Sequence, residues 1–174
     1  IQDIEALKLL IKSLIERDVR LSLDASALRK EILPVIKGKN VLVTPHPGEF
    51  ERLFGEKIPI DKKTRISIIE KHAKKNLLTI MLKGSDDIIS DGSKTLINSK
   101  KTPAMTVGGT GDVLSGIAAS MLSRNRNVME AAASAAFLNG QAGKTIQKQF
   151  GMHMIASDLI DALPAVSKIF DRIK

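Results

Sequence analysis

The sequence predicts an α/β layer fold with a mostly parallel sheet. Two short, continuous apolar runs, at 40–44 and 77–82, are typical of strands that are buried on both faces. Helical periodicity, with apolar residues recurring three and four positions apart, is present over 2–17 and 61–75. Strands that alternate with amphipathic helices favour a parallel sheet with helices packed on its faces.

The remaining elements of the N-terminal half follow from local patterns. Residues 19–23 predict a short strand. Residues 25–33 predict a short helix that Pro34 stops, because proline disrupts a helix interior. A helical turn is expected over 48–54, with Gly55 closing it.

The C-terminal half predicts one hairpin and then only helices. The hairpin spans 88–97 and turns at Asp91-Gly92, a dipeptide that favours tight turns. The helices are expected at 112–122, 130–149, 156–163 and 165–173. No linker or internal repeat divides the chain, so residues 1–174 are interpreted as a single domain.

Composition excludes several classes of protein. The chain has no cysteine, so a disulfide scaffold, a cysteine zinc site and a thiol nucleophile are excluded. No apolar run is long enough to span a bilayer, and the first residues do not resemble a signal peptide. We therefore expect no membrane association and a cytoplasmic location.

The net charge of +8 invites a nucleic-acid interpretation, but its distribution argues against one. The 27 Lys and Arg residues are spread along the chain without a basic arm. Trp and Tyr are absent and only 5 Phe occur, so aromatic platforms for stacking bases are nearly absent. We expect no nucleic-acid partner. A basic surface also suits a polyanionic small molecule such as a nucleotide.

A glycine-rich loop at Gly108-Gly109-Thr110-Gly111-Asp112 directly precedes an apolar helix. Small residues let backbone N–H groups approach an anion, and a helix N-terminus adds partial positive charge, so the loop predicts a phosphate cradle. The loop is neither a Walker A motif nor a dinucleotide fingerprint, because no Lys-Ser/Thr pair follows and Leu114 occupies the third glycine position. Asp112 fits a general base beside the phosphate, or only a residue stabilising the helix dipole.

Polar residues follow three predicted strands. Thr44-Pro45-His46-Pro47-Gly48-Glu49 follows one, and two prolines confine the backbone of His46. Ligands of open α/β sheets bind beyond the carboxyl ends of strands, so His46 is a candidate ligand contact; it also fits an exposed residue before a helix start.

Two further strand ends carry weaker signals. Lys83-Gly84-Ser85 suits phosphate contact, although Lys-Gly is also common in turns. Asp24 suits a substrate hydroxyl or water-bound Mg²⁺, or equally a helix cap. With the glycine loop, these segments predict one site at a single edge of the sheet.

Four segments resemble the ADP/ATP-dependent NAD(P)H-hydrate dehydratases of the ribokinase-like superfamily. They are VLVTPHPGEF at 41–50, MLKGSDDII at 81–89, AMTVGGTGDVLSGI at 104–117 and GMHMIASDLIDALP at 151–164. The resemblance implies a ribokinase-like three-layer fold of which 1–174 is the C-terminal portion, lacking the N-terminal β/α units. We therefore expect the missing part to be a separate or removed N-terminal segment of the same protein. We also expect a homo-oligomer, a tetramer.

The implied activity is repair of nicotinamide cofactors. ADP or ATP phosphorylates the hydroxyl on the ring of (6S)-NADH or NADPH hydrate, and elimination of phosphate restores NADH or NADPH. By motif, Asp112 is the base at that hydroxyl, and His46 contacts the hydrated cofactor. The nucleotide contacts implied are Lys83, Gly84, Ser85, Asp86, Asp87, Gly109, Thr110 and Gly111. Mg²⁺ is implied without a nameable ligand, and Ser26 stands where the family usually has aspartate.

Two alternatives use the same residues. A ribokinase-like kinase for a hydroxymethylpyrimidine, a thiazole or a sugar would employ the same Asp112. An inactive nucleotide-binding fragment is the other alternative. The TPHPGE segment at 44–49 fits the repair enzymes better than the kinases.

Overall fold

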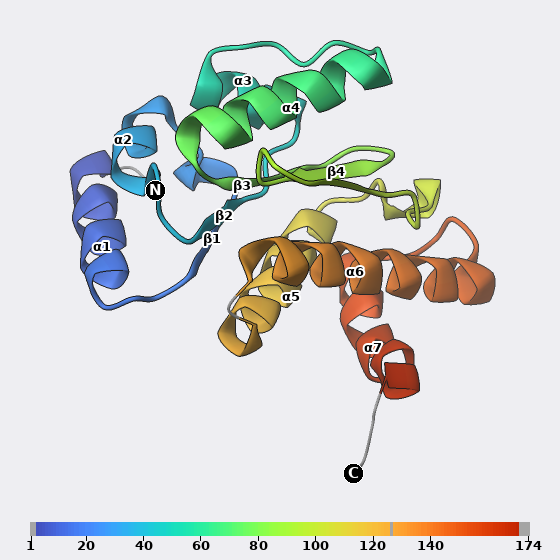
Figure 1. Ribbon diagram of the computed structural model, residues 1–174. Helices are drawn as coiled ribbons and strands as arrows, with labels where there is room; N and C mark the ends of the chain where they lie inside the picture. Colours follow the sequence, from blue (N-terminus) through green and yellow to red (C-terminus); the bar gives the residue numbers. More distant parts are fainter. Residues whose placement is uncertain (1–2, 126, 171–174) are drawn as a thin grey trace.

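A five-stranded sheet forms the middle layer of the protein in the computed structural model, which describes residues 3–125 and 127–170 (Figure 1). The strands lie side by side in sequence order: β1 (Leu21–Leu23), β2 (Val41–Val43), β3 (Thr79–Leu82), β4 (Asp87–Ser90) and β5 (Thr95–Asn98). The pairs β1–β2 and β2–β3 are parallel. The predicted hairpin is the antiparallel pair β4–β5, and β3–β4 is antiparallel as well. The sheet is therefore mixed, with parallel pairing confined to β1, β2 and β3.

Helices cover both faces of this sheet, as Figure 1 shows. One face is covered by α1 (Ile4–Glu16), α2 (Leu33–Ile36), α3 (Pro47–Phe54) and α4 (Lys62–Asn76). The other is covered by α5 (Thr110–Arg124) and α6 (Val128–Phe150), on which α7 (Ala156–Ser167) packs. Short 3₁₀ helices occur at Ala25–Ala27, Lys30–Ile32, Pro103–Met105 and Lys168–Phe170. The three-layer architecture expected from the resemblance is confirmed.

Alternation along the buried strands explains why their sequences are continuously apolar. Val41 and Val43 of β2 belong to the core beneath α1–α4, whereas Leu42 belongs to the core beneath α5 and α6. In the same way, Ile80 and Met81 of β3 lie in opposite cores. Successive side chains of a strand point to opposite faces, so a strand between two helical layers needs an apolar residue at every position.

Two prolines act differently from the prediction. Pro34 lies in the first turn of α2 instead of ending a helix at 25–33, because the first helical turn does not require the missing N–H. Pro164 lies inside α7, where two helices were expected. The helix continues past it because Leu159 and Val166 on either side are buried in one core. Residues 171–173 of the last predicted helix lie outside the described residues.

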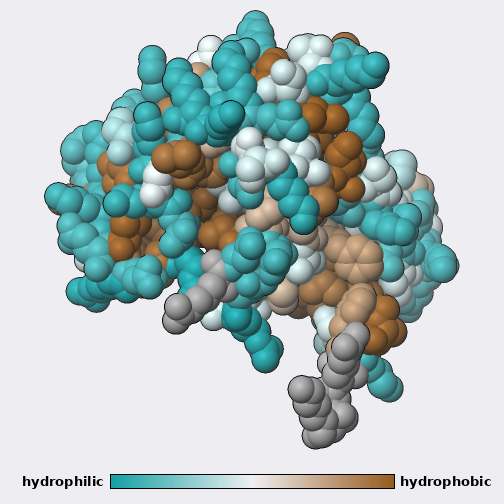
Figure 2. All heavy atoms as spheres, viewed as in Figure 1, coloured by the Kyte–Doolittle hydropathy of each residue, from teal (hydrophilic) through white to brown (hydrophobic). Residues whose placement is uncertain are grey.

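The surface over α3 and α4 is largely hydrophilic, as the upper part of Figure 2 shows. Lys and Arg are abundant on α4, which places part of the positive charge there. None of the helices among the described residues combines the length and the apolar composition that crossing a bilayer requires.

The connection between α3 and α4 is anchored by Glu56. One carboxylate oxygen of Glu56 lies 2.7 Å from Lys71 Nζ and 2.8 Å from His72 Nε2. The buried His72 ring packs on Phe50 and Phe54 of α3, with ring centroids 5.3 Å and 4.7 Å away. Because α3 begins at the predicted site, this cluster fixes the helix that carries part of it.

Glu56→Gln is expected to reduce the loss of stability in acid. Hydrogen bonds from Lys71, and then from His72, lower the pKa of Glu56 below 4.5. A carboxyl with a lowered pKa stabilises the fold above its unfolded pKa, and this contribution is lost as the pH falls through the folded pKa. The pair is partly exposed, so the effect should stay below about 1 kcal/mol.

Urea unfolding of the two proteins between about pH 6 and pH 3 measures this difference. The variant should be less stable at pH 6, and its free energy of unfolding should fall less steeply with acid. Glu51→Gln is the matched control, because the only ion pair of Glu51 among the described residues is with an exposed lysine at 4.0 Å. Identical pH slopes for wild type and Glu56→Gln would disprove the role of this carboxylate.

Candidate active site

Hydrogen bonds tie the carboxyl ends of β1, β2 and β3 to one another. Thr44, after β2, donates to the carbonyl of Leu23 through its backbone N–H at 3.1 Å and its hydroxyl at 3.2 Å. Lys83, after β3, donates its backbone N–H to the carbonyl of Pro45 at 2.8 Å. The residues that follow these strands therefore lie at a single edge of the sheet, as predicted.

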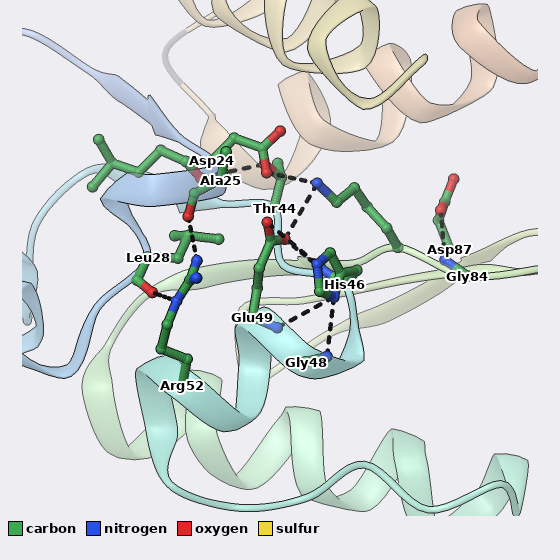
Figure 3. Close-up of polar contacts among 12 residues, drawn as sticks. Asp24, Ala25, Leu28, Thr44, His46, Gly48, Glu49, Arg52, Gly84 and Asp87 are labelled. Atoms are coloured by element: carbon green, nitrogen blue, oxygen red, sulfur yellow. Dashed lines mark hydrogen bonds and ion pairs between the residues drawn. The ribbon is translucent and has the colours of Figure 1, made fainter. Parts of the chain in front are cut away.

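A lysine lies between two carboxylates at this edge, and Figure 3 labels the two carboxylate residues, Asp24 and Glu49. Lys83 Nζ lies 2.6 Å from Asp24 Oδ1 and 3.5 Å from Glu49 Oε2. All three side chains are at most 15% exposed, so water screens their interaction only weakly. Asp24 makes no side-chain cap to the 3₁₀ helix that follows it, so the helix-cap alternative for this residue is wrong. Its carboxylate holds Lys83 instead.

His46 both caps α3 and lines the site. Its ring Nδ1 accepts hydrogen bonds from the backbone N–H groups of Gly48 at 3.0 Å and Glu49 at 3.3 Å. The backbone N–H of His46 in turn donates to Glu49 Oε2 at 2.8 Å. This reciprocal capping box fixes the ring. Because Nδ1 accepts, a neutral ring carries its proton on Nε2. The interpretation as a helix start is thus correct, and it also orients the imidazole.

The glycine loop comes over the same edge. Gly109 precedes α5 with a φ of 89°, a conformation that favours glycine. The Thr110 hydroxyl donates to the carbonyls of Met105 at 3.0 Å and Val107 at 3.1 Å, which holds the loop closed. A Cβ on Gly111 would lie 3.6 Å from Lys83 Nζ and 4.0 Å from Asp24 Oδ2. The first turn of α5 therefore faces the lysine directly.

A cavity of about 880 Å³ lies between the loop and the strand ends. Its lining includes six predicted residues: His46, Lys83, Gly84, Ser85, Thr110 and Gly111. A helix N-terminus, free backbone N–H groups and a lysine at one cavity are the features that bind phosphate. The site can therefore receive a polyanion.

Asp112 faces a neighbouring cavity. Its side chain is exposed and forms no hydrogen bond or ion pair with any described residue. It lines a space of about 510 Å³ between α5 and α7, together with Gly116, Ile160 and Leu163. Consecutive residues of the first turn of α5, Gly111 and Asp112, thus face two different cavities, which suits binding of two ligands on either side of the helix N-terminus.

The sequence model of the NAD(P)H-hydrate dehydratase family matches residues 2–165. The chain belongs to the NAD(P)H-hydrate dehydratase family. This confirms the family that the motifs indicated.

Individual relatives agree with this assignment. The chain is 57% identical over 173 residues to the ADP-dependent (S)-NAD(P)H-hydrate dehydratase of Nitrosopumilus maritimus, covering 99% of this chain and 60% of the relative. The crystal structure of the ADP/ATP-dependent NAD(P)H-hydrate dehydratase of Bacillus subtilis, co-crystallised with ATP/Mg²⁺, matches with a TM-score of 0.83 and 30% identity, covering 96% of this chain and 61% of that one. The chain thus spans about 60% of the length of these relatives.

A kinase also shares the architecture. The hydroxyethylthiazole kinase of Pyrococcus horikoshii matches with a TM-score of 0.79 at 19% identity, covering 95% of this chain and 68% of that one. A likeness at this identity shows the fold alone. The kinase alternative therefore gains no support beyond the shared architecture.

Three of the residues predicted to contact the nucleotide, namely Asp86, Asp87 and Gly109, do not line the cavity. Asp86 points to Lys62 of α4 at 2.6 Å, and the lysine lowers the pKa of Asp86. Asp87 is fully buried and pairs with Lys101 Nζ at 2.9 Å. Lys101 also donates to the carbonyl of Gly84 at 3.3 Å. Asp87 thus shapes the Lys83-Gly84-Ser85 turn through Lys101, and neither aspartate lines the cavity.

Two residues that line the cavity, Lys101 and Asn139, were not predicted from the sequence. Lys101 brings a second ammonium group to the lining, and its only signal was a Lys-Lys pair. Asn139 of α6 is 1% exposed, and its Oδ1 has no hydrogen-bond partner among the described residues. A polar residue within the Ala-rich helix was the available signal.

The residues present fit a magnesium ion that is held mainly by phosphate. The described residues contain no group of three or more His, Cys, Asp or Glu side chains that could enclose a metal. Mg²⁺ commonly takes one or two carboxylates and completes its shell with water and substrate phosphate. Asp24 is suited to this, because Lys83 binds its Oδ1 and its Oδ2 lies on the side of Gly111.

Proposed function

We propose that this chain carries the nucleotide and substrate sites of an NAD(P)H-hydrate dehydratase that uses ADP or ATP. The observation that carries the proposal is the approach of Gly111 to Lys83 above the carboxyl ends of three strands. The relatives named for this activity support it, as does the family assignment. Because the chain spans about 60% of those relatives, the activity is proposed for the unit that contains it.

The nucleotide phosphates would lie in the larger cavity. The backbone N–H groups of Gly109, Thr110 and Gly111 would bind them at the N-terminus of α5, where the helix dipole favours an anion. The ammonium groups of Lys83 and Lys101 line the same cavity. Mg²⁺, when bound, would neutralise charge on the phosphates, with Asp24 as its protein ligand.

The hydrated cofactor would extend from Asp112 at the smaller cavity to His46 at the larger one. The Asp112 carboxylate takes the proton of the ring hydroxyl while that oxygen attacks the terminal phosphorus, and AMP leaves from ADP. The phosphate ester then loses phosphate from one ring carbon and a proton from the neighbouring carbon, which restores the ring double bond. The fixed Nε2–H of His46 is a hydrogen-bond donor for the substrate.

The experiment that tests this proposal follows the ultraviolet absorbance of NADH in a mixture of the chain, NADH hydrate, ADP and Mg²⁺. We expect ADP-dependent recovery of NADH, with AMP and phosphate as products. ADP binding without turnover would identify the chain as the nucleotide-binding fragment. Phosphorylation of a hydroxymethylpyrimidine or a thiazole alcohol without NADH recovery would identify a kinase instead.

The assembly is part of the proposal. We propose a homo-oligomer, a tetramer, and a cytoplasmic location. Light scattering of the purified chain measures the oligomeric state, and a monomer at working concentration would contradict the tetramer.

A further inference from the structure

The loop after β1 contains a backbone conformation that its side chain disfavours. Ala25 has a φ of 53°, in the left-handed region that residues with a Cβ rarely adopt. Ala25 directly follows Asp24, the carboxylate that holds Lys83. The backbone of this residue therefore sets the direction in which Asp24 projects, and the surrounding structure must hold the strained conformation in place.

A single arginine of α3 grips this loop at two points (Figure 3). Arg52 Nη2 donates to the carbonyl of Ala25 at 2.6 Å, and Arg52 Nε donates to the carbonyl of Leu28 at 2.8 Å. The planar guanidinium presents its donors in a fixed fork, so two bonds define both the distance and the orientation of the loop. The same helix holds Glu49, which contacts Lys83 from the other side.

We propose that Arg52 is a positioning residue of the active site. It holds Ala25 in the left-handed conformation, and this sets Asp24 against Lys83 beside Gly111. The ammonium of Lys83 thereby stays in place to meet a nucleotide phosphate, a consequence that rests on the proposed function. We call the two hydrogen bonds from Arg52 to this loop the clamp. It is inferred from the contacts of Arg52, Ala25 and Asp24, which do not depend on the proposed function.

Arg52→Gln removes the guanidinium group, and two measurements on this variant test the clamp. The first is the rate at which an activated ester acylates Lys83, followed by mass spectrometry, which requires no nucleotide. We expect it to rise several-fold, because a Lys83 side chain that Asp24 no longer holds in place becomes more accessible to the reagent. The second is ADP affinity by calorimetry, which should fall about tenfold, as expected for losing charged hydrogen bonds that position a group.

A second substitution separates positioning from simple stabilisation. Glycine adopts a φ of 53° without a Cβ clash, so Ala25→Gly in the Arg52→Gln background should restore most of the ADP affinity and slow the acylation of Lys83. Arg65→Gln is the matched control, because Arg65 also donates to a loop carbonyl, that of Pro59, but Pro59 lies in a loop that contains none of the proposed site residues. It should change neither measurement.

The outcomes are distinct. A lower melting temperature for Arg52→Gln with unchanged acylation and ADP affinity would overturn the proposal, and so would failure of Ala25→Gly to restore them. If Arg52→Gln does not fold, Arg52→Lys keeps the charge and one bond, and it should show the same changes at smaller size. If the wild-type chain binds no ADP, the proposed function is wrong. The acylation rates of Lys83 in the wild type and in Arg52→Gln would still show whether Arg52 holds the loop.

Discussion

Asp112→Asn is expected to reduce NADH recovery by about 10²–10⁴-fold, the usual effect of removing a general base. Asparagine has nearly the same shape as aspartate but does not accept a proton at neutral pH. Because the Asp112 side chain is exposed and has no hydrogen-bond partner among the described residues, its replacement breaks no structural contact. ADP affinity and the melting temperature should therefore stay close to those of the wild type.

The measurement is the rate of NADH recovery at saturating ADP and hydrate, in whichever assembly shows turnover. Asp161→Asn is the matched control, since Asp161 is an exposed helical aspartate that does not line either cavity at the first turn of α5. It should retain full activity. Wild-type turnover in Asp112→Asn would leave the proposed base without a role, and lost ADP affinity would assign Asp112 to nucleotide binding instead.

The edge of the sheet that carries the site was predictable because its signals are local. Asp24 and Lys83 directly follow β1 and β3, His46 follows β2 after two intervening residues, and parallel neighbours end at one edge. The glycine loop was predictable for the same reason, since Gly109 precedes a helix. These inferences need only the order of residues along the chain.

The direction of individual side chains was not predictable from that order. Asp86 and Asp87 are adjacent, but one reaches an exposed lysine of α4 and the other is buried with Lys101. Neighbours on a helix diverge as well, so Gly111 and Asp112 face separate cavities. Such differences depend on which elements pack nearby, which a single sequence does not state.

Contacts between residues that are far apart in the sequence could not be predicted either. Arg52 grips a loop 27 residues earlier in the chain, and no spacing rule connects the two positions. Pro34 and Pro164 show the same limit, because tertiary packing decides whether a proline starts a helix, ends it or lies within it. Sequence therefore predicts which groups reach the site edge, whereas packing decides how they are held.

Gly111→Leu is expected to weaken ADP binding by roughly 10–100-fold, because the leucine side chain would occupy the space that the phosphate needs. A Cβ at this position already lies 3.6 Å from Lys83 Nζ, so the longer leucine side chain would occupy the space between the helix N-terminus and the lysine. Phosphate would then lose both the backbone N–H groups of α5 and the ammonium group. Calorimetric titration with ADP measures the effect.

Two further variants distinguish the effect of a large side chain at position 111 from the effect of a large side chain elsewhere on α5. Gly111→Ala places only the Cβ, at ordinary contact distance, and should weaken binding less while raising helix stability by about 1 kcal/mol. Ala119→Leu introduces the same side chain at an exposed position of α5 that lines neither cavity, so ADP affinity should not change. Equal affinities for all three variants would show that phosphate does not bind at the first turn of α5.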